Sequence, residues 1–170
     1  KRQRINNAAG FRFLNLKLKQ KKGSHEKISF VFISIIPGIC NHFIPAGSGR
    51  YPSVLVRTPY NKQAEEWMGQ ALNIFGIAVI VQDVRGKFQS GGEFYPFINE
   101  RKDGLETIRW VRKQPWSDGT VAGWGASYLG YTQWAISDSL DFMTLMLTGA
   151  RLFDLVYPDS LFSLQTAGIW

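Results

Sequence analysis

From residue 51 onward, short β-like runs alternate with helix-like stretches, and this alternation limits the possible folds more than any other feature. Such alternation is typical of βαβ units, in which helices join parallel strands. The β-like runs lack strict apolar-polar alternation, as expected for strands covered on both faces. We therefore predict an α/β fold with a mainly parallel sheet and flanking helices, in which the strands are Ser53–Arg57, Ile77–Gln82, Thr120–Gly123 and Phe142–Leu147.

Apolar residues recur at helical spacing between the expected strands. The spacing predicts helices over about Lys62–Phe75, Glu100–Lys113 and Tyr128–Asp138. Trp67 and Phe75 fall on the apolar stripe of the first helix, so we expect both side chains to face the sheet. The third helix is apolar nearly all round and should be the most buried of the three.

Positive charge is concentrated at the beginning of the sequence. The 170 residues carry a formal net charge of +7 and are 45% hydrophobic, the composition of one globular domain. Residues 1–27 hold nine Lys and Arg against one acid, whereas residues 28–170 hold eleven against twelve acids. We place a compositional boundary between residues 1–42, a basic arm or unmatched segment, and a packed domain over residues 43–170.

Two strands are expected before that boundary. Residues Phe11–Lys19 alternate in part, which suits an edge strand, and the apolar run Ile28–Cys40 suits a buried one. Residues 1–27 offer little apolar surface to offset the entropy of ordering, so we expect them to lie outside the packed domain. Cys40 is the only cysteine, which excludes an internal disulfide, and no run reaches the roughly 18 apolar residues of a membrane helix.

The segment from Gly123 to Gly130 places Ser127 between small residues, after a β-like run and before a helix-like one. This context is typical of a nucleophile elbow, a turn so tight that the serine backbone is strained and its neighbours must be small. The turn would expose the hydroxyl and place the Tyr128 N–H at a helix N-terminus, where it can stabilise an oxyanion. Without these flanks, an ordinary turn or helix cap would be the better interpretation. The small neighbours are Gly125, Ala126 and Gly130.

Four further patterns accompany the elbow in chain order. R-x-P-Y begins at Arg57, D-x-R-G-x-x-x-S-x-G at Asp83, E-x-x-D-G at Glu100 and W-x-D-G at Trp116. With G-x-S-Y-x-G at the elbow, they resemble the X-Pro dipeptidyl-peptidase and cocaine-esterase-like serine hydrolases. The resemblance covers about residues 44–154. It implies the N-terminal part of an α/β-hydrolase catalytic domain, truncated before the cap.

The resemblance also implies roles for individual residues. Ser127 would be the nucleophile, and the Tyr60 hydroxyl and the Tyr128 backbone N–H would form the oxyanion hole. A phenol suits this task because it is a donor and its pKa near 10 keeps it neutral. Without the elbow, packing beside the Pro59 turn would be the simpler interpretation of Tyr60.

Asp83 and Arg85 are interpreted as structural support for the site. Two residues apart and before Gly86, they could form a local charge-assisted pair that fixes a turn. Asp103 with Gly104, and Asp118 with Gly119, are interpreted as helix and turn boundaries.

The general base is missing from the sequence. A hydrolase triad of this kind runs serine, acid, histidine, and no histidine follows Ser127. His25 and His42 both precede it, and a surface or unstructured role is expected for each. The sequence also starts without methionine, so we expect part of a longer protein that is inactive in this form.

Two function classes remain open. The first is a serine hydrolase that cleaves acyl esters or X-Pro and other amide bonds through an acyl-enzyme, with small esters or short peptides as substrates. It needs no cofactor and no metal. The alternative is a binding module that uses the basic arm on an anionic partner, through Lys17, Lys19, Lys21 and Lys22. Residues 28–170 are nearly neutral, which argues against nucleic acid as a partner. The sequence indicates neither a cellular compartment nor an oligomeric state.

Overall fold

The computed structural model describes residues 40–151, 156–157 and 161–163. Its elements in chain order are β1 (Cys40–Phe43), β2 (Tyr51–Thr58), the 3-10 helix η1 (Lys62–Glu65), α1 (Glu66–Asn73), β3 (Ala78–Asp83), α2 (Glu100–Arg112), β4 (Ser117–Ala126), α3 (Tyr128–Trp134), a second 3-10 helix η2 (Ser137–Ser139) and β5 (Phe142–Met146). The expected strand Phe11–Lys19, the basic residues 1–27 with the four arm lysines, His25 and residues 28–39 lie outside these ranges.

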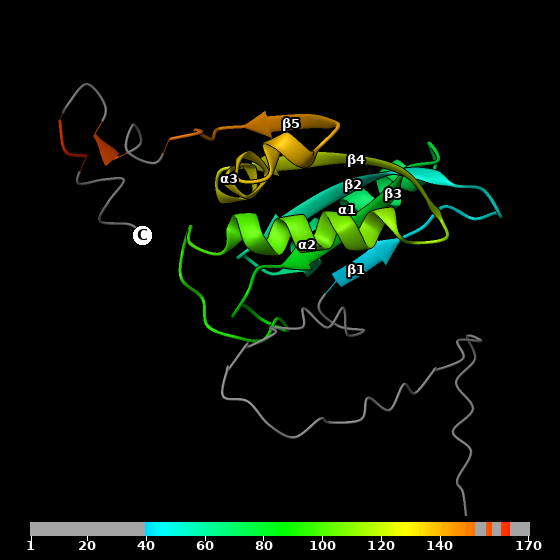
Figure 1. The fold of residues 1–170 in the computed structure, drawn as a ribbon, viewed down its shortest axis with the longest axis horizontal. Coiled ribbons are helices and arrows are strands. Elements are labelled where there is room, and N and C mark those ends of the chain that lie inside the picture. The colour runs from blue at the N-terminus through cyan, green and yellow to red at the C-terminus, as the bar shows by residue number, and fades with distance from the viewer. Residues whose placement is uncertain (1–39, 152–155, 158–160, 164–170) are drawn as a thin grey trace, which may run out of the picture. The chain divides into compact units, whose positions relative to one another are not determined.

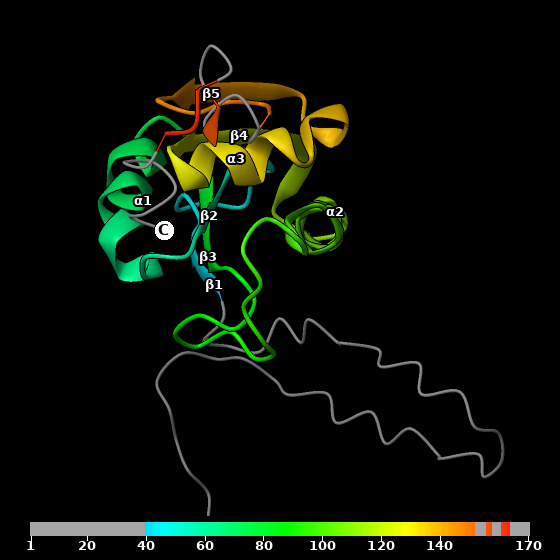
Figure 2. The ribbon, with the colours of Figure 1, turned by 90° about the vertical axis from the view of Figure 1, so that its left-hand side faces the viewer.

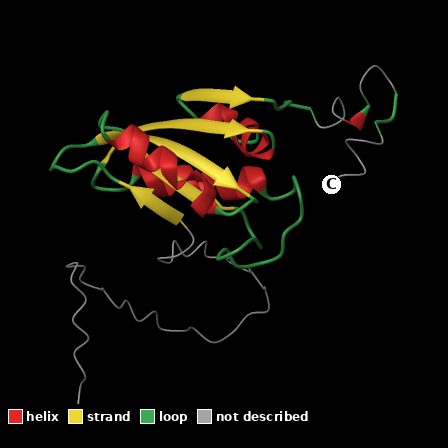
Figure 3. Cartoon of the chain, turned by 180° about the vertical axis from the view of Figure 1, so that it is seen from behind, coloured by secondary structure: helices red, strands yellow, loops and turns green. Residues whose placement is uncertain are grey.

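The five described strands form one sheet in the order β1-β3-β2-β4-β5. β2 pairs in parallel with β3 and β4, and β4 pairs in parallel with β5, whereas β1 is antiparallel to β3. The arrow of β1 points against that of β5 in Figure 1 and, seen from behind, in Figure 3. The loops that leave β2, β3 and β4 therefore begin at one edge of the sheet. The pairing confirms the predicted α/β fold with a mainly parallel sheet.

Helices cover both faces of this sheet, with α1 on one side and α2 on the other (Figure 2). α1 contributes Met68 to a buried cluster that includes Val56. α2 contributes Ile108 to a second buried cluster that includes Leu55. Adjacent residues of β2 thus face opposite helices, and both are fully buried. This two-sided burial explains why the strands read as continuous apolar runs.

The four strands predicted from residue 51 onward are all present, with ends shifted by up to three residues. The boundary predicted between residues 1–42 and 43–170 falls inside β1. Residues 40–42 pair with β3 and belong to the sheet. A strand of four residues is too short for its side-chain pattern to stand out from the sequence before it.

The helices depart more from prediction. The stretch 62–75 divides into η1 and α1, and Trp67 and Phe75 are 57% and 73% exposed, so the prediction that both face the sheet is wrong. α3 is shorter than predicted, but five of its seven residues are buried. That proportion exceeds the six of thirteen in α2, as expected. No helix within the described ranges has the length and apolar character needed to cross a membrane.

Candidate active site

Ser127 occupies the turn between β4 and α3 in a strained backbone conformation, with φ 53° and ψ −124°. Positive φ is rare for residues other than glycine and persists only where the surroundings impose it. Here the Ser127 N–H donates to the Met146 carbonyl at 3.0 Å, and the Ser127 carbonyl accepts from the Tyr131 N–H at 3.1 Å. The end of β5 and the first turn of α3 therefore hold the serine from two sides.

The glycines beside Ser127 make room for this turn. A Cβ on Gly125 would lie 2.3 Å from the backbone of Leu129, and one on Gly130 would lie 2.5 Å from the Thr148 side chain. The first contact involves backbone atoms, which cannot rotate away. β4 and α3 can therefore approach this closely because Gly125 lacks a side chain, and Gly130 leaves room for Thr148 after β5.

Tyr60 follows β2 and reaches Ser127 across the same edge of the sheet. Partial burial raises the pKa of the Tyr60 phenol, and the nearby Ser127 hydroxyl offsets part of that effect. The Tyr60 side chain is 47% exposed, so the phenol is also open to solvent. The turn that carries it has Asn61 at φ 92°, and the Tyr60 N–H donates to the Thr58 hydroxyl at 3.1 Å.

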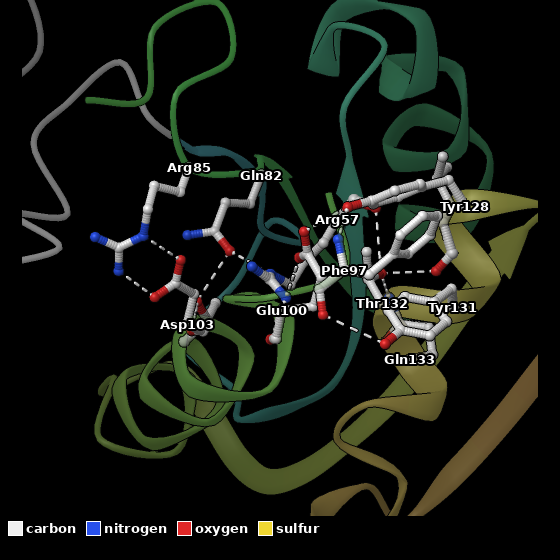
Figure 4. A network of polar contacts seen from close by, with 12 residues as sticks. Arg57, Gln82, Arg85, Phe97, Glu100, Asp103, Tyr128, Tyr131, Thr132 and Gln133 are labelled. Carbon is white, nitrogen blue, oxygen red and sulfur yellow. Dashed lines mark hydrogen bonds and ion pairs between the residues drawn. The ribbon is translucent and has the colours of Figure 1, made fainter. Parts of the chain in front are cut away.

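Tyr128 is the first residue of α3, so its backbone N–H lies at the helix N-terminus beside Ser127. Its side chain turns inward and is only 2% exposed. The phenol donates to Glu100 Oε1 at 2.9 Å and accepts the Phe97 N–H at 2.9 Å (Figure 4). Burial, with the nearby Glu100 carboxylate, raises the pKa of this phenol. Tyr60 and Tyr128 also meet edge to face, with ring centroids 6.5 Å apart.

The expected local pair between Asp83 and Arg85 does not form. Asp83 instead binds Lys62: Oδ2 lies 3.2 Å from Nζ, and Oδ1 accepts the Lys62 N–H at 2.8 Å. Both side chains are at most 1% exposed. Lys62 lies two residues after Tyr60, so Asp83 fixes the turn that carries Tyr60, while Lys62 Nζ also donates to Gln89 Oε1 in the loop after β3 at 2.5 Å.

Arg85 pairs with Asp103 of α2, and its Nε donates to Asp103 Oδ2 at 2.8 Å (Figure 4). Asp103 is therefore an ion-pair partner rather than a helix boundary. Gly104 is likewise a packing residue, because a Cβ there would lie 3.0 Å from Arg57 Nη1. Asp118 and Gly119 lie inside β4 rather than at a boundary, and Asp118 Oδ1 accepts the Thr120 N–H at 2.8 Å.

Arg57 and Glu100 form a third buried pair that the sequence alone does not reveal. Arg57 Nη1 lies 3.1 Å from Glu100 Oε2 and donates to the Glu100 carbonyl at 2.7 Å. Arg57 Nε donates to Gln82 Oε1 at 3.0 Å (Figure 4). Arg57 ends an apolar β-like run, and Glu100 begins the E-x-x-D-G pattern. The sequence does not indicate that they pair, because they are 43 residues apart.

The described residues do not bring a histidine to Ser127. His42 lies in β1, which β3 and β2 separate from β4, and its ring meets Trp110 at a centroid distance of 6.4 Å. No histidine follows Ser127 in the sequence. The described residues therefore offer a positioned hydroxyl, a nearby phenol and a helix N-terminus, without a histidine base.

The comparisons with known proteins agree on one family. Residues 40–170 match the model of the X-Pro dipeptidyl-peptidase (S15) family. Cocaine esterase from Rhodococcus sp. (strain MB1 Bresler) is 37% identical over 121 residues, which cover 66% of this chain and 21% of the esterase. This chain thus spans about a fifth of the length of that relative.

Solved structures agree on the fold. An aminopeptidase from the marine sediment archaeon Thaumarchaeota archaeon aligns with TM-score 0.54 and 27% identity over 63% of this chain and 22% of its own. A CocE/NonD family hydrolase from Staphylococcus aureus aligns with TM-score 0.55 and 25% identity over 61% and 24%. An α/β hydrolase from Penicillium sp. sh18 aligns with TM-score 0.53 and 20% identity over 61% and 39%. The sheet and its flanking helices are therefore part of an α/β-hydrolase fold.

Proposed function

Because the chain belongs to the X-Pro dipeptidyl-peptidase (S15) family of hydrolases, we propose that it carries the nucleophile and oxyanion hole of a serine hydrolase. The observation that carries this proposal is the strained turn at Ser127, whose positive φ is held by bonds to the Met146 carbonyl and the Tyr131 N–H. Tyr60 approaches the same turn, with its ring against that of Tyr128. A structural serine would not need this strained backbone.

In the proposed reaction, the Ser127 oxygen attacks the acyl carbon of the substrate while its proton passes to a general base. The carbonyl oxygen becomes an oxyanion and accepts hydrogen bonds from the Tyr60 hydroxyl and the Tyr128 N–H. Collapse expels the alcohol or amine, which takes the proton, and leaves an acyl-enzyme on Ser127. Water then releases the acid and restores the serine.

The substrates proposed are small esters or short peptides with an X-Pro or other amide bond. The described residues leave the choice between ester and amide open. The base and the third triad member are proposed to be a histidine and an acid that follow Ser127 in an extended version of the chain. Without a base, a serine loses on the order of 10⁴ to 10⁶ in rate.

The test is acyl-enzyme formation in that extended version. An aryl ester should give a burst of the leaving group, and mass spectrometry should locate the acyl group on Ser127. Ser127→Ala should abolish both the burst and the adduct. A Ser127→Ala protein that still forms the adduct would contradict the proposal. Ser139→Ala is the matched control because Ser139 is a half-buried serine in η2 whose hydroxyl bonds Asp138.

A further inference from the structure

The Tyr128 hydroxyl lies at the centre of a buried set of contacts that the proposed reaction does not use. It donates to Glu100 Oε1 and accepts the Phe97 N–H, both at 2.9 Å (Figure 4). Glu100 is 3% exposed, and its other carboxylate oxygen lies 3.1 Å from Arg57 Nη1. The Arg57 guanidinium thus fixes the Glu100 carboxylate, and that carboxylate fixes the Tyr128 hydroxyl.

Phe97 attaches the same tyrosine to the loop before α2. Its ring stacks on Tyr128 with centroids 4.8 Å apart and meets Tyr131 edge to face at the same distance. The Phe97 carbonyl accepts the Tyr131 hydroxyl at 3.3 Å. Phe97 itself has φ 68°, a conformation that needs outside support in a phenylalanine. Two tyrosines one turn apart on α3 provide it.

We propose that Glu100 is a positioning residue for the elbow: through the Tyr128 hydroxyl, its carboxylate fixes the residue whose backbone N–H completes the oxyanion hole. The backbone of Tyr128 follows directly on the strained Ser127, so the side-chain anchor restrains both residues. This inference rests on the proposed function for its catalytic consequence, but the restraint itself can be measured without catalysis.

The first measurement is amide hydrogen exchange in the chain as it stands. Tyr128→Phe keeps the ring stack and removes the hydroxyl. The Ser127 and Tyr131 amides, which form the two backbone bonds of the elbow, should then exchange about 10-fold faster relative to the Val81 amide of β3. Glu100→Gln should act on the same two amides. Ile108→Val is the control, because it removes a methylene from the core under α2 without touching Tyr128.

Equal acceleration of all three amides in Tyr128→Phe would overturn the inference, since it would mean that the hydroxyl only stabilises the domain as a whole. The inference also fails if Ile108→Val changes the Ser127 amide as much as Tyr128→Phe does. Should Glu100→Gln fail to fold, Tyr128→Phe still decides.

The second measurement uses the extended version. Misplacing the Tyr128 N–H should lower kcat about 10- to 100-fold with little change in KM, because the interaction matters chiefly in the transition state. An unchanged kcat in Tyr128→Phe, with Ser127→Ala inactive, overturns the positioning role alone. An active Ser127→Ala protein overturns the proposed function. The hydrogen-exchange measurement alone then decides whether Glu100 restrains Tyr128.

Discussion

Ser127 holds a backbone conformation that costs about 1–3 kcal/mol, and the residues around it explain why that conformation persists. Its N–H and carbonyl both form hydrogen bonds. A Cβ on Gly125 would lie 2.3 Å from the backbone of α3, so only glycine allows the helix to pack this closely. The sequence predicts this turn well, because serine, small neighbours and the strand-to-helix transition are all local features. The approach of Tyr60 to this turn, by contrast, required the parallel pairing of β2 and β4.

Gly125→Ala should destabilise the domain by about 1–3 kcal/mol, because the added Cβ meets backbone atoms that cannot rotate away. Urea unfolding of the chain measures this change. Gly91→Ala is the matched control, since a Cβ there meets nothing within 4 Å, and it should alter stability by less than about 0.5 kcal/mol. Equal stability of the two variants would mean that the elbow relaxes freely.

Tyr60→Phe should lower kcat of the extended version by about 10² to 10³ with little change in KM. The variant removes one proposed oxyanion donor and keeps the ring that contacts Tyr128. Steady-state kinetics on an aryl ester give both constants. Tyr51→Phe serves as the control, because the Tyr51 hydroxyl bonds the Ala46 carbonyl instead. An unchanged kcat would leave Tyr60 as a packing residue.

The phenol of Tyr60 should stay protonated to a pH above 10, because partial burial raises its pKa from the ordinary 10.0. A raised pKa means that the donor form persists as pH rises, so a Tyr60-dependent rate should also persist past pH 10. The ultraviolet absorbance of ionised phenol, taken as the difference between the unmodified chain and Tyr60→Phe, measures the titration. A midpoint below 10 would contradict the expected direction.

At the scale of elements, the strands were predictable and the first helix was not. Runs of Val, Ile and Leu mark β2 and β3 because both faces are buried. The prediction of a single helix over residues 62–75 fails because Lys62, a residue type usually found at the surface, is buried by its ion pair with Asp83 at the end of β3. A 3-10 helix begins at Lys62, and α1 begins only at Glu66. Trp67, in the first turn of α1, is exposed.

Lys62→Met should destabilise the domain by about 3–5 kcal/mol, because it leaves the buried Asp83 carboxylate without its cation. Adding Asp83→Asn should recover a large part of the loss, since the amide is neutral and its oxygen can still accept the Lys62-position N–H. Urea unfolding of both variants and of Lys102→Met, an exposed lysine in α2, gives the comparison. A double variant as unstable as Lys62→Met would contradict the charge argument.

At the scale of the whole molecule, three ion pairs join the ends of β2 and β3 to each other and to α2. They are Arg57–Glu100, Lys62–Asp83 and Arg85–Asp103. Five of the six residues lie inside the sequence patterns, and Lys62 lies outside them. The patterns do not show the pairing, because the partners lie 18 to 43 residues apart. Buried charges need partners, so these pairs fix the loops from which Tyr60 and Phe97 approach the elbow.

The 170-residue chain should be inert toward esters, and the extended version should be active. The elbow presents a serine hydroxyl whose pKa is that of an alcohol, so without a base almost none of it is nucleophilic at neutral pH. No histidine follows Ser127, and His42 lies across the sheet in β1. Hydrolysis of an aryl ester by both proteins, each with its Ser127→Ala counterpart, measures the difference. Ser127-dependent turnover by the shorter chain at a rate near that of the extended version would mean that another group acts as the base.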